Sequence, residues 1–318
     1  MLNRIKSLQL NNEVDFLSIL TLLASVLILS VAAILTKLSE FDIGPSATVF
    51  NRYLIAVITL SLWQTIEIAT KASPDQVADD WRIKYQLSDI FVICIESIMS
   101  LGCILLWAFS FTKTSVANSN LLHNMTPIFA ILGGWLILGQ HFNRRFLIGM
   151  AIALAASSSI QFQDWRINYD YFFGDSLAFM SSILYAGAFL AREKLRSKFS
   201  AGTILLWSCT FRLILSLPIV LLTEDKLFPS TYSGWLAVIS LGVLVQVIGH
   251  GLLTYSLKKF SSGFVSTCLL LDPIFTAIFA WIIFSEQLSV LNCAAFLVVL
   301  IGMYLAITGK GAEKDAVE

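Results

Sequence analysis

The sequence has little charge and little histidine. Charged residues make up 13% of its 318 residues, and three residues are histidine. Soluble globular proteins carry about 25% charged residues, so this chain has too few to cover a soluble surface. Its 21 basic and 21 acidic side chains balance, and no net positive field would attract nucleic acid. The composition therefore excludes an ordinary soluble enzyme, a disordered chain and a nucleic-acid-binding protein.

The motifs of common metal sites and active sites are also absent. The cysteines form no CxxC pair or Cys/His cluster, which argues against a metal site or a disulfide framework; they are Cys94, Cys103, Cys209, Cys268 and Cys293. The sequence contains no HExxH, GxSxG or GxGD motif. We therefore expect no enzymatic activity, no metal and no cofactor, and keep a membrane-embedded enzyme only as a remote alternative.

Long apolar runs are abundant. Hydrophobic residues make up 57% of the chain, and the mean hydropathy is +0.79. A helix needs about 20 apolar residues to cross a bilayer, and the first run is too long for the core of a signal peptide. Because the runs are continuous rather than alternating, they predict helices and not barrel strands. The predicted spans are 16–37, 46–69, 89–111, 116–138, 145–163, 174–192, 203–222, 234–256, 262–284 and 290–308.

The basic residues predict the orientation of these spans. With the N-terminus in the cytoplasm, 15 of the 21 basic residues, Arg192 among them, fall in cytoplasmic segments and four fall outside. Such an excess of basic residues marks the cytoplasmic side. The sequence thus predicts an all-α, multi-pass protein of a bacterial inner or plasma membrane with both termini in the cytoplasm. It leaves open whether the chain forms a homodimer in the lipid bilayer.

An internal repeat divides the chain. Shifted by 146 residues, the segment 110–137 aligns without a gap on 256–283. The identical pairs are Ser110/Ser256, Lys113/Lys259, Ser115/Ser261, Pro127/Pro273, Ile128/Ile274, Phe129/Phe275, Trp135/Trp281 and Ile137/Ile283. The halves 1–163 and 164–318 would each hold five spans, so the second would be inverted. Inverted repeats are typical of secondary transporters that work by alternating access, with the substrate site between the halves.

Two matched prolines predict bends in the helices. Proline removes a backbone donor and clashes with the carbonyl four residues earlier. Pro127 should therefore free the carbonyl of His123, and Pro273 that of Leu269. Bends at matching places in both halves indicate two helices that line one cavity.

Arg52, Glu96, Arg212 and Asp272 are the clearest charged residues away from the ends of the predicted spans, where insertion of a charge costs roughly 2.5–3.5 kcal/mol. Asp272 is either a substrate or proton ligand, or a structural group that pairs with Arg212 or caps the broken helix. The apolar neighbours of Glu96 favour a proton-coupling role, with a hydrogen bond to a nearby Ser or Asn as the alternative. Arg52 and Arg212 could bind a substrate carboxylate or be paired structurally.

Polar side chains complete the candidate substrate site. On a helix, Asn120 and Asn124 share a face with Pro127, where their amides could bind a zwitterion or join neighbouring helices. His250 lies one turn after Gln246 and is either a substrate ligand or a packing residue.

The chain resembles the drug/metabolite transporter superfamily in its EamA-like branch. The resemblance rests on Ser261-Ser262-Gly263, on Leu271-Asp272-Pro273-Ile274-Phe275, and on Phe284-Ser285-Glu286-Gln287-Leu288. It continues in Ala117 to Gln140 and in Lys37 and Arg52, and covers about 16–308. Gln140 departs from the pattern, since the family commonly has Glu there.

The resemblance implies secondary transport, usually export, of small metabolites such as amino acids or their relatives. The polarity of the predicted site slightly favours amino-acid-like substrates. Drugs, nucleotide-sugars and sugar derivatives are the alternative substrate classes.

Overall fold

A computed structural model describes residues 17–70, 86–162, 171–284, 290–309 and 311. This part of the chain is helical and contains no β-strand. Its helical segments are 17–29, α2 (Ala32–Glu40), α3 (Pro45–Thr70), α5 (Leu87–Phe111), α6 (Val116–His123), α7 (Thr126–Leu138), α8 (Arg144–Phe162), α9 (Phe172–Arg196), α10 (Ala201–Thr223), α11 (Tyr232–Ser240), the π-helix η2 (Leu241–Gly249), α12 (His250–Ser256), α13 (Ser262–Cys268), the 3₁₀ turn η3 (Leu269–Leu271), α14 (Asp272–Phe284) and α15 (Val290–Ile307).

Within the described ranges, seven helices are long and apolar enough to cross a membrane. They are Leu17–Glu40, Pro45–Ile66, Leu87–Phe111, Asn118–Leu138, Phe172–Arg196, Ala201–Thr223 and Tyr232–Ser256. Two shorter apolar helices are Ser262–Thr276 and Ala294–Ile307. All-helical structure follows from the continuous apolar runs, because a helix satisfies its own backbone groups in lipid. The count of ten spans, the inversion of the second half and the side of the termini remain predictions.

Polarity in this protein is reversed relative to a soluble one. Large apolar side chains such as Trp63, Leu136 and Leu222 are exposed, while Glu96, Arg192 and Arg212 are buried. An apolar surface of this extent is stable only against an apolar surrounding such as lipid. The interior polar groups are those that need an explanation.

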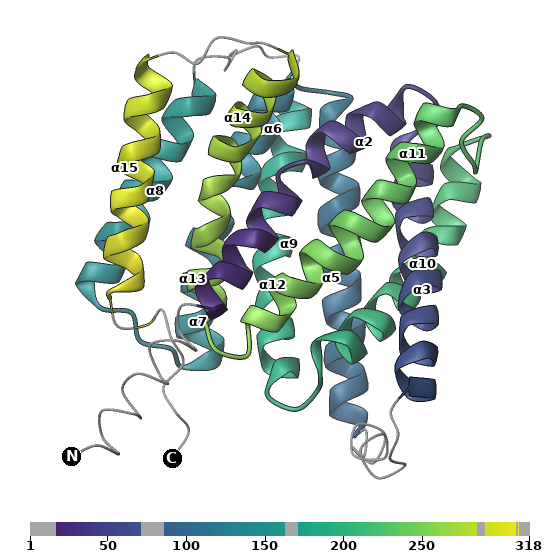
Figure 1. Ribbon diagram of the computed structural model, residues 1–318, viewed down its shortest axis with the longest axis horizontal. Coiled ribbons are helices and arrows are strands. Elements are labelled where there is room, and N and C mark those ends of the chain that lie inside the picture. The colour runs from purple at the N-terminus through teal and green to yellow at the C-terminus, as the bar shows by residue number, and fades with distance from the viewer. Residues whose placement is uncertain (1–16, 71–85, 163–170, 285–289, 310, 312–318) are drawn as a thin grey trace.

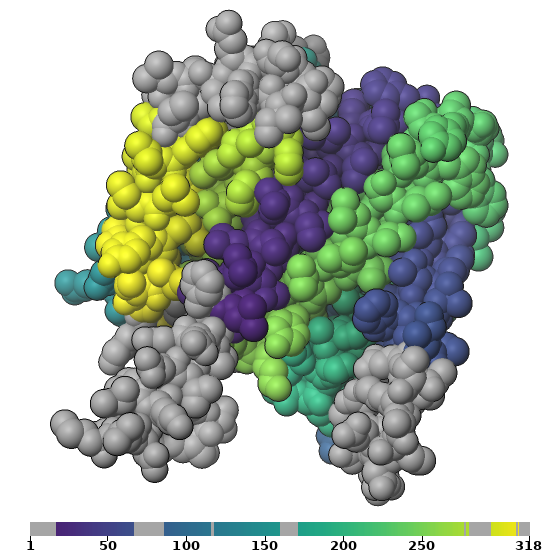
Figure 2. All heavy atoms as spheres, viewed as in Figure 1, coloured from purple at the N-terminus to yellow at the C-terminus, as the bar shows by residue number. Residues whose placement is uncertain are grey.

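The helices pack as neighbouring pairs. Helix α5 lies along α9, α8 along α15, and α3 along α10. On the face shown in Figures 1 and 2, α2 and α11 cross the molecule side by side. The two helices of the α8/α15 pair lie at one side of this view, away from α3 and α10.

Reciprocal small residues bring α8 and α15 into close contact. A Cβ atom added to Gly302 would lie 2.6 Å from the backbone nitrogen of Ala153, and one added to Gly149 would lie 2.5 Å from that of Ala306. Each helix therefore carries a small residue four positions after its glycine, the pattern that lets membrane helices approach closely. Since the opposing atoms are backbone atoms, they cannot move aside for a side chain.

We expect Gly302→Ala to destabilise the protein by about 1–3 kcal/mol, the usual cost of overpacking. The clash outweighs the higher helix propensity of alanine, which is worth about 0.5–1 kcal/mol. Thermal unfolding in detergent would measure the effect. Gly202→Ala in α10 is the matched control, because a Cβ atom there meets nothing within 4 Å. Equal melting temperatures for the two variants would contradict the close contact.

Two helices are interrupted just before the matched prolines. Ser115 and Ser261, a pair in the internal repeat, cap the starts of α6 and α13 through their side-chain oxygens. Helix α6 ends at His123, whose carbonyl accepts a hydrogen bond from Thr126 Oγ1 at 2.7 Å. The carbonyl of Leu269 accepts the backbone N–H of Asp272 in a 3₁₀ turn. Both carbonyls therefore accept hydrogen bonds from donors other than the usual backbone N–H four residues later. Asn124 and Asp272 lie at the two helix breaks.

Two further irregularities occur without a proline. The helix 17–29 stops at Ser30 and Val31 before α2 begins, and the carbonyl of Ser30 accepts a hydrogen bond from Thr276 Oγ1 at 3.3 Å. Between α11 and α12 the chain forms the nine-residue π-helix η2. Segments of π-helix are often found at functional sites.

Candidate functional site

The helix breaks lie around a cavity of about 90 Å³, and His250, the residue directly after η2, is part of its wall. Its wall comes from segments far apart in the sequence. The lining residues are Leu29, Ala32, Arg52, Cys103, Ile104, Trp107, His123, Asn124, Tyr185, His250, Leu269 and Asp272. One cation, one carboxylate, two imidazoles and an amide thus converge on a small, otherwise apolar space, which is the usual composition of a small-molecule site.

Four of the six predicted substrate ligands line this cavity: Arg52, Asn124, His250 and Asp272. Within the described residues, Asn120 and Arg212 are not part of the lining. Asn120 instead accepts a hydrogen bond from the indole nitrogen of Trp107 at 3.2 Å. It therefore holds a lining residue rather than lining the cavity itself.

Asp272 stands at the first position of α14. Its carboxylate lines the cavity and has no ion-pair or hydrogen-bond partner in the described part of the chain. The positive end of the helix dipole favours a carboxylate at this position by typically 0.3–1 kcal/mol. Asp272 therefore presents an unpaired acidic group to whatever fills the cavity.

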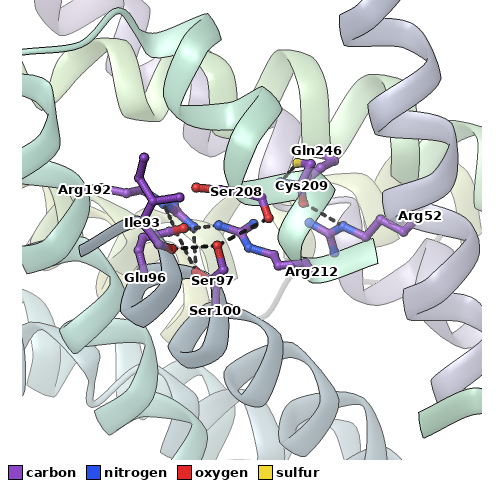
Figure 3. A network of polar contacts seen from close by, with 10 residues as sticks. All are labelled: Arg52, Ile93, Glu96, Ser97, Ser100, Arg192, Ser208, Cys209, Arg212 and Gln246. Atoms are coloured by element: carbon purple, nitrogen blue, oxygen red, sulfur yellow. Dashed lines mark hydrogen bonds and ion pairs between the residues drawn. The ribbon is translucent and has the colours of Figure 1, made fainter. Parts of the chain in front are cut away.

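Arg52 is the matching cation. It is buried, with 3% of its surface exposed, and its Nε donates to Gln246 Oε1 at 3.0 Å. The amide nitrogen Nε2 of Gln246 in turn lies 3.6 Å from Cys209 Sγ. Within the described residues no carboxylate lies within ion-pair distance of Arg52. Gln246 thus orients the guanidinium without neutralising it (Figure 3).

Glu96 is the centre of a buried ion cluster (Figure 3). Its Oε1 accepts hydrogen bonds from Arg192 Nε at 2.6 Å, Arg212 Nη2 at 2.5 Å and Ser100 Oγ at 2.9 Å. Ser100 Oγ also accepts from Arg192 Nη2 at 2.9 Å. The guanidinium of Arg212 lies 5.4 Å from the ring centre of Tyr53, a cation–π distance. The cluster ties α5, α9 and α10 together beside the cavity.

The tautomer of His123 follows from its neighbour. Ser181 Oγ donates its single proton to the carbonyl of Ala178 at 2.6 Å. It must therefore accept from His123 Nδ1, which lies 2.8 Å away. In the neutral ring, Nε2 then carries no proton and is an acceptor. His123 lines the cavity and stacks on Tyr185, with 5.2 Å between ring centres.

The structure differs from three expectations about the charges. Arg192 is not an exposed residue of a connecting segment, because α9 continues to Arg196 and leaves Arg192 only 1% exposed. Glu96 does not lie among apolar groups, because the chain brings two guanidiniums to it. Arg212 pairs with Glu96 and not with Asp272.

Sequence reasoning missed Tyr185 and Cys103 as cavity residues. Tyr185 comes four residues after Ser181 and four before Phe189, a spacing that places all three on one helix face. That face carries polar groups in the middle of an apolar span, which is the signal that could have found it. Cys103 offered no such signal, because it lies within an apolar run. Glu286, the predicted counterpart of Gln140, lies outside the described residues.

Comparison with known proteins agrees with this architecture. A crystal structure of a protein of 15% sequence identity superposes with a TM-score of 0.75, over 91% of this chain and 96% of the other. The likeness shows a shared fold. Among curated proteins, an uncharacterized transporter of Archaeoglobus fulgidus is 24% identical over 299 residues, which is 90% of this chain and 96% of the relative.

A second relative is the pseudopaline exporter CntI of Pseudomonas aeruginosa. It is 22% identical over 223 residues, or 69% of this chain and 76% of the relative. The profile of the EamA-like transporter family matches residues 16–160 and again residues 172–308. These matches take in nearly all of the helical structure and the whole cavity lining. The chain therefore belongs to the EamA-like transporter family and is a membrane protein of the transporter type.

Proposed function

We propose that this protein is a secondary transporter that exports small amino-carboxylates across a bacterial inner membrane by alternating access. Arg52 binds the carboxylate of the substrate, and Asp272 binds its amine. Asn124, His250 and Nε2 of His123 supply the remaining polar contacts. The proposal includes no enzymatic step, and its partners are the substrate and the lipid bilayer.

One observation carries this proposal: the cavity has an unpaired cation and an unpaired carboxylate in the same wall. Buried charges without partners are costly, so they are retained where a ligand completes them. A zwitterion would neutralise both at once. A neutral sugar or an apolar drug would leave both charges unpaired, and a nucleotide-sugar has no amine to pair with the carboxylate of Asp272.

The matching helix breaks in the two halves of the chain support alternating access. The breaks before Pro127 and Pro273 occupy matching places in the repeat, and the two family matches support a division into the halves 1–163 and 164–318. The cavity of about 90 Å³ is below the roughly 300–1,000 Å³ of ligand pockets. Substrate entry therefore needs the helices to separate on one side. The relative named as an exporter supports outward transport.

Asp272 is also our candidate for proton coupling. A carboxylate that is unpaired and reaches the cavity can take up and release a proton as the cavity changes sides. Glu96 was the other candidate, but its two guanidinium partners stabilise the ionised form. We therefore assign Glu96 to holding the helices together.

The test is transport by the purified protein in proteoliposomes loaded with a panel of labelled amino acids, sugars and hydrophobic cations. We expect counterflow of amino acids that saturates and responds to an imposed pH gradient, and no flux of the other classes. Empty liposomes are the control. Current that does not depend on substrate, or gradient-driven flux of sugars or drugs alone, would contradict the proposal.

A further inference from the structure

The charges around the cavity do not balance. Among the described residues, three buried guanidiniums, those of Arg52, Arg192 and Arg212, face two carboxylates, Glu96 and Asp272. The other buried charges, Arg196 and Glu193, lie near the end of α9 and are one of each sign. In the part of the chain that the structure describes, the surroundings of the cavity therefore carry one more positive than negative charge even when Asp272 is ionised.

The hydrogen bonding of the arginines is also incomplete. Arg192 Nη1 and Arg212 Nε are buried donors without a partner in the described structure. One carboxylate oxygen, Glu96 Oε1, serves both guanidiniums. Buried donors on charged groups are costly when unpaired. Glu96 thus neutralises one of the two arginines and leaves the equivalent of one cation uncompensated.

The uncompensated positive charge lies close to the cavity wall. Arg52 lines the cavity together with His250 and Tyr185. The guanidinium of Arg192 lies 5.9 Å from the ring centre of Phe189, which packs against Tyr185 with 4.5 Å between ring centres. A neutral zwitterion would satisfy Arg52 and Asp272 but would leave the positive field of the cluster in place. A substrate with a further negative charge would compensate it.

We propose that the preferred substrates are small amino acids with a second carboxylate, that is, molecules with one amine, two carboxylates and a net charge of −1. This inference rests on the proposed function and specifies the substrate charge for the same site. The amine pairs with Asp272, one carboxylate with Arg52, and the second carboxylate offsets the field of Arg192 and Arg212.

The test compares substrates of equal shape and different charge. In proteoliposomes containing the full chain, we expect unlabelled glutamate and aspartate to compete for counterflow at concentrations at least about tenfold lower than glutamine and asparagine. One uncompensated charge at a separation of several ångströms accounts for a factor of this size.

A variant of one neighbour tests the charge count directly. Gln246→Glu keeps the shape of the group that holds Arg52 Nε and adds the missing negative charge. It should reduce the preference for glutamate over glutamine to about twofold or less. Thr112→Glu is the matched control, because it adds the same charge at an exposed position and should leave the preference unchanged.

The outcomes separate the two proposals. Transport of glutamine and asparagine as good as that of glutamate and aspartate would overturn the inference and leave the proposed function standing. Absence of flux with every amino acid would overturn the proposed function itself. The wild-type comparison decides the question even if Gln246→Glu fails to fold.

Discussion

Replacing Asp272 by asparagine is expected to weaken substrate binding by about 30-fold or more and to leave the protein folded. Removing one partner of a buried charge pair costs about 2 kcal/mol or more, and the amine of the bound substrate would lose its carboxylate. Stability should hold, because the Asp272 carboxylate makes no ion pair within the described residues and asparagine is accepted at a helix start. The measurement is the concentration dependence of counterflow, together with the melting temperature in detergent.

Asp89→Asn provides the matched control. Asp89 is also a carboxylate on a membrane helix, but it pairs with Lys198 and does not line the cavity. This variant should transport as the wild type does. Normal transport by Asp272→Asn would contradict our assignment, and so would loss of folded protein, which would make Asp272 a structural group.

Replacing Glu96 by glutamine is expected to destabilise the protein by about 3–5 kcal/mol, the usual cost of leaving a buried charge without its partner. Glutamine preserves the shape of the side chain and one acceptor oxygen. The loss of stability therefore measures the effect of the missing negative charge between Arg192 and Arg212. Thermal and denaturant unfolding in detergent would measure it.

The other members of the cluster provide the comparison. Arg192→Met should cost less than Glu96→Gln, because Glu96 would still pair with Arg212. Adding Arg192→Met to Glu96→Gln should recover part of the loss, since one orphaned cation is removed. If Glu96→Gln unfolds like the wild type and instead loses pH-driven accumulation, Glu96 is the proton-coupling group and our assignment to structure is wrong.

Much of the helical fold could be predicted because its signals are local. Each predicted span contains helix in the structure, since continuous apolar runs in lipid have no other way to satisfy the backbone. The freed carbonyls at His123 and Leu269 could be anticipated because proline chemistry acts on a fixed neighbour. The break at Ser30 and the π-helix η2 carry no proline, and nothing in the adjacent sequence marks them.

The pairing of charges could not be predicted. Glu96 and Arg192 are 96 residues apart, and Glu96 and Arg212 are 116 apart. Which arginine meets which carboxylate depends on the packing of α5, α9 and α10, and the sequence offered Asp272 as an equally good partner for Arg212. The cavity residues with the clearest sequence signal were charged residues within an apolar run, as Asp272 beside Pro273 and Arg52 are.

The π-helix η2 has a consequence for how related chains can diverge. Gln246 lies within η2 and His250 directly follows it, so the length of this segment decides which side chain meets Arg52 and which lines the cavity. A π-helix holds more residues per turn than an α-helix, and deleting one residue would let it tighten into regular α-helix. The tighter twist of the α-helix would offset part of the rotation lost with the deleted residue, but the side chains within η2 and just after it would face in new directions. A single-codon deletion in η2 would therefore exchange part of the cavity wall without substituting any residue of it.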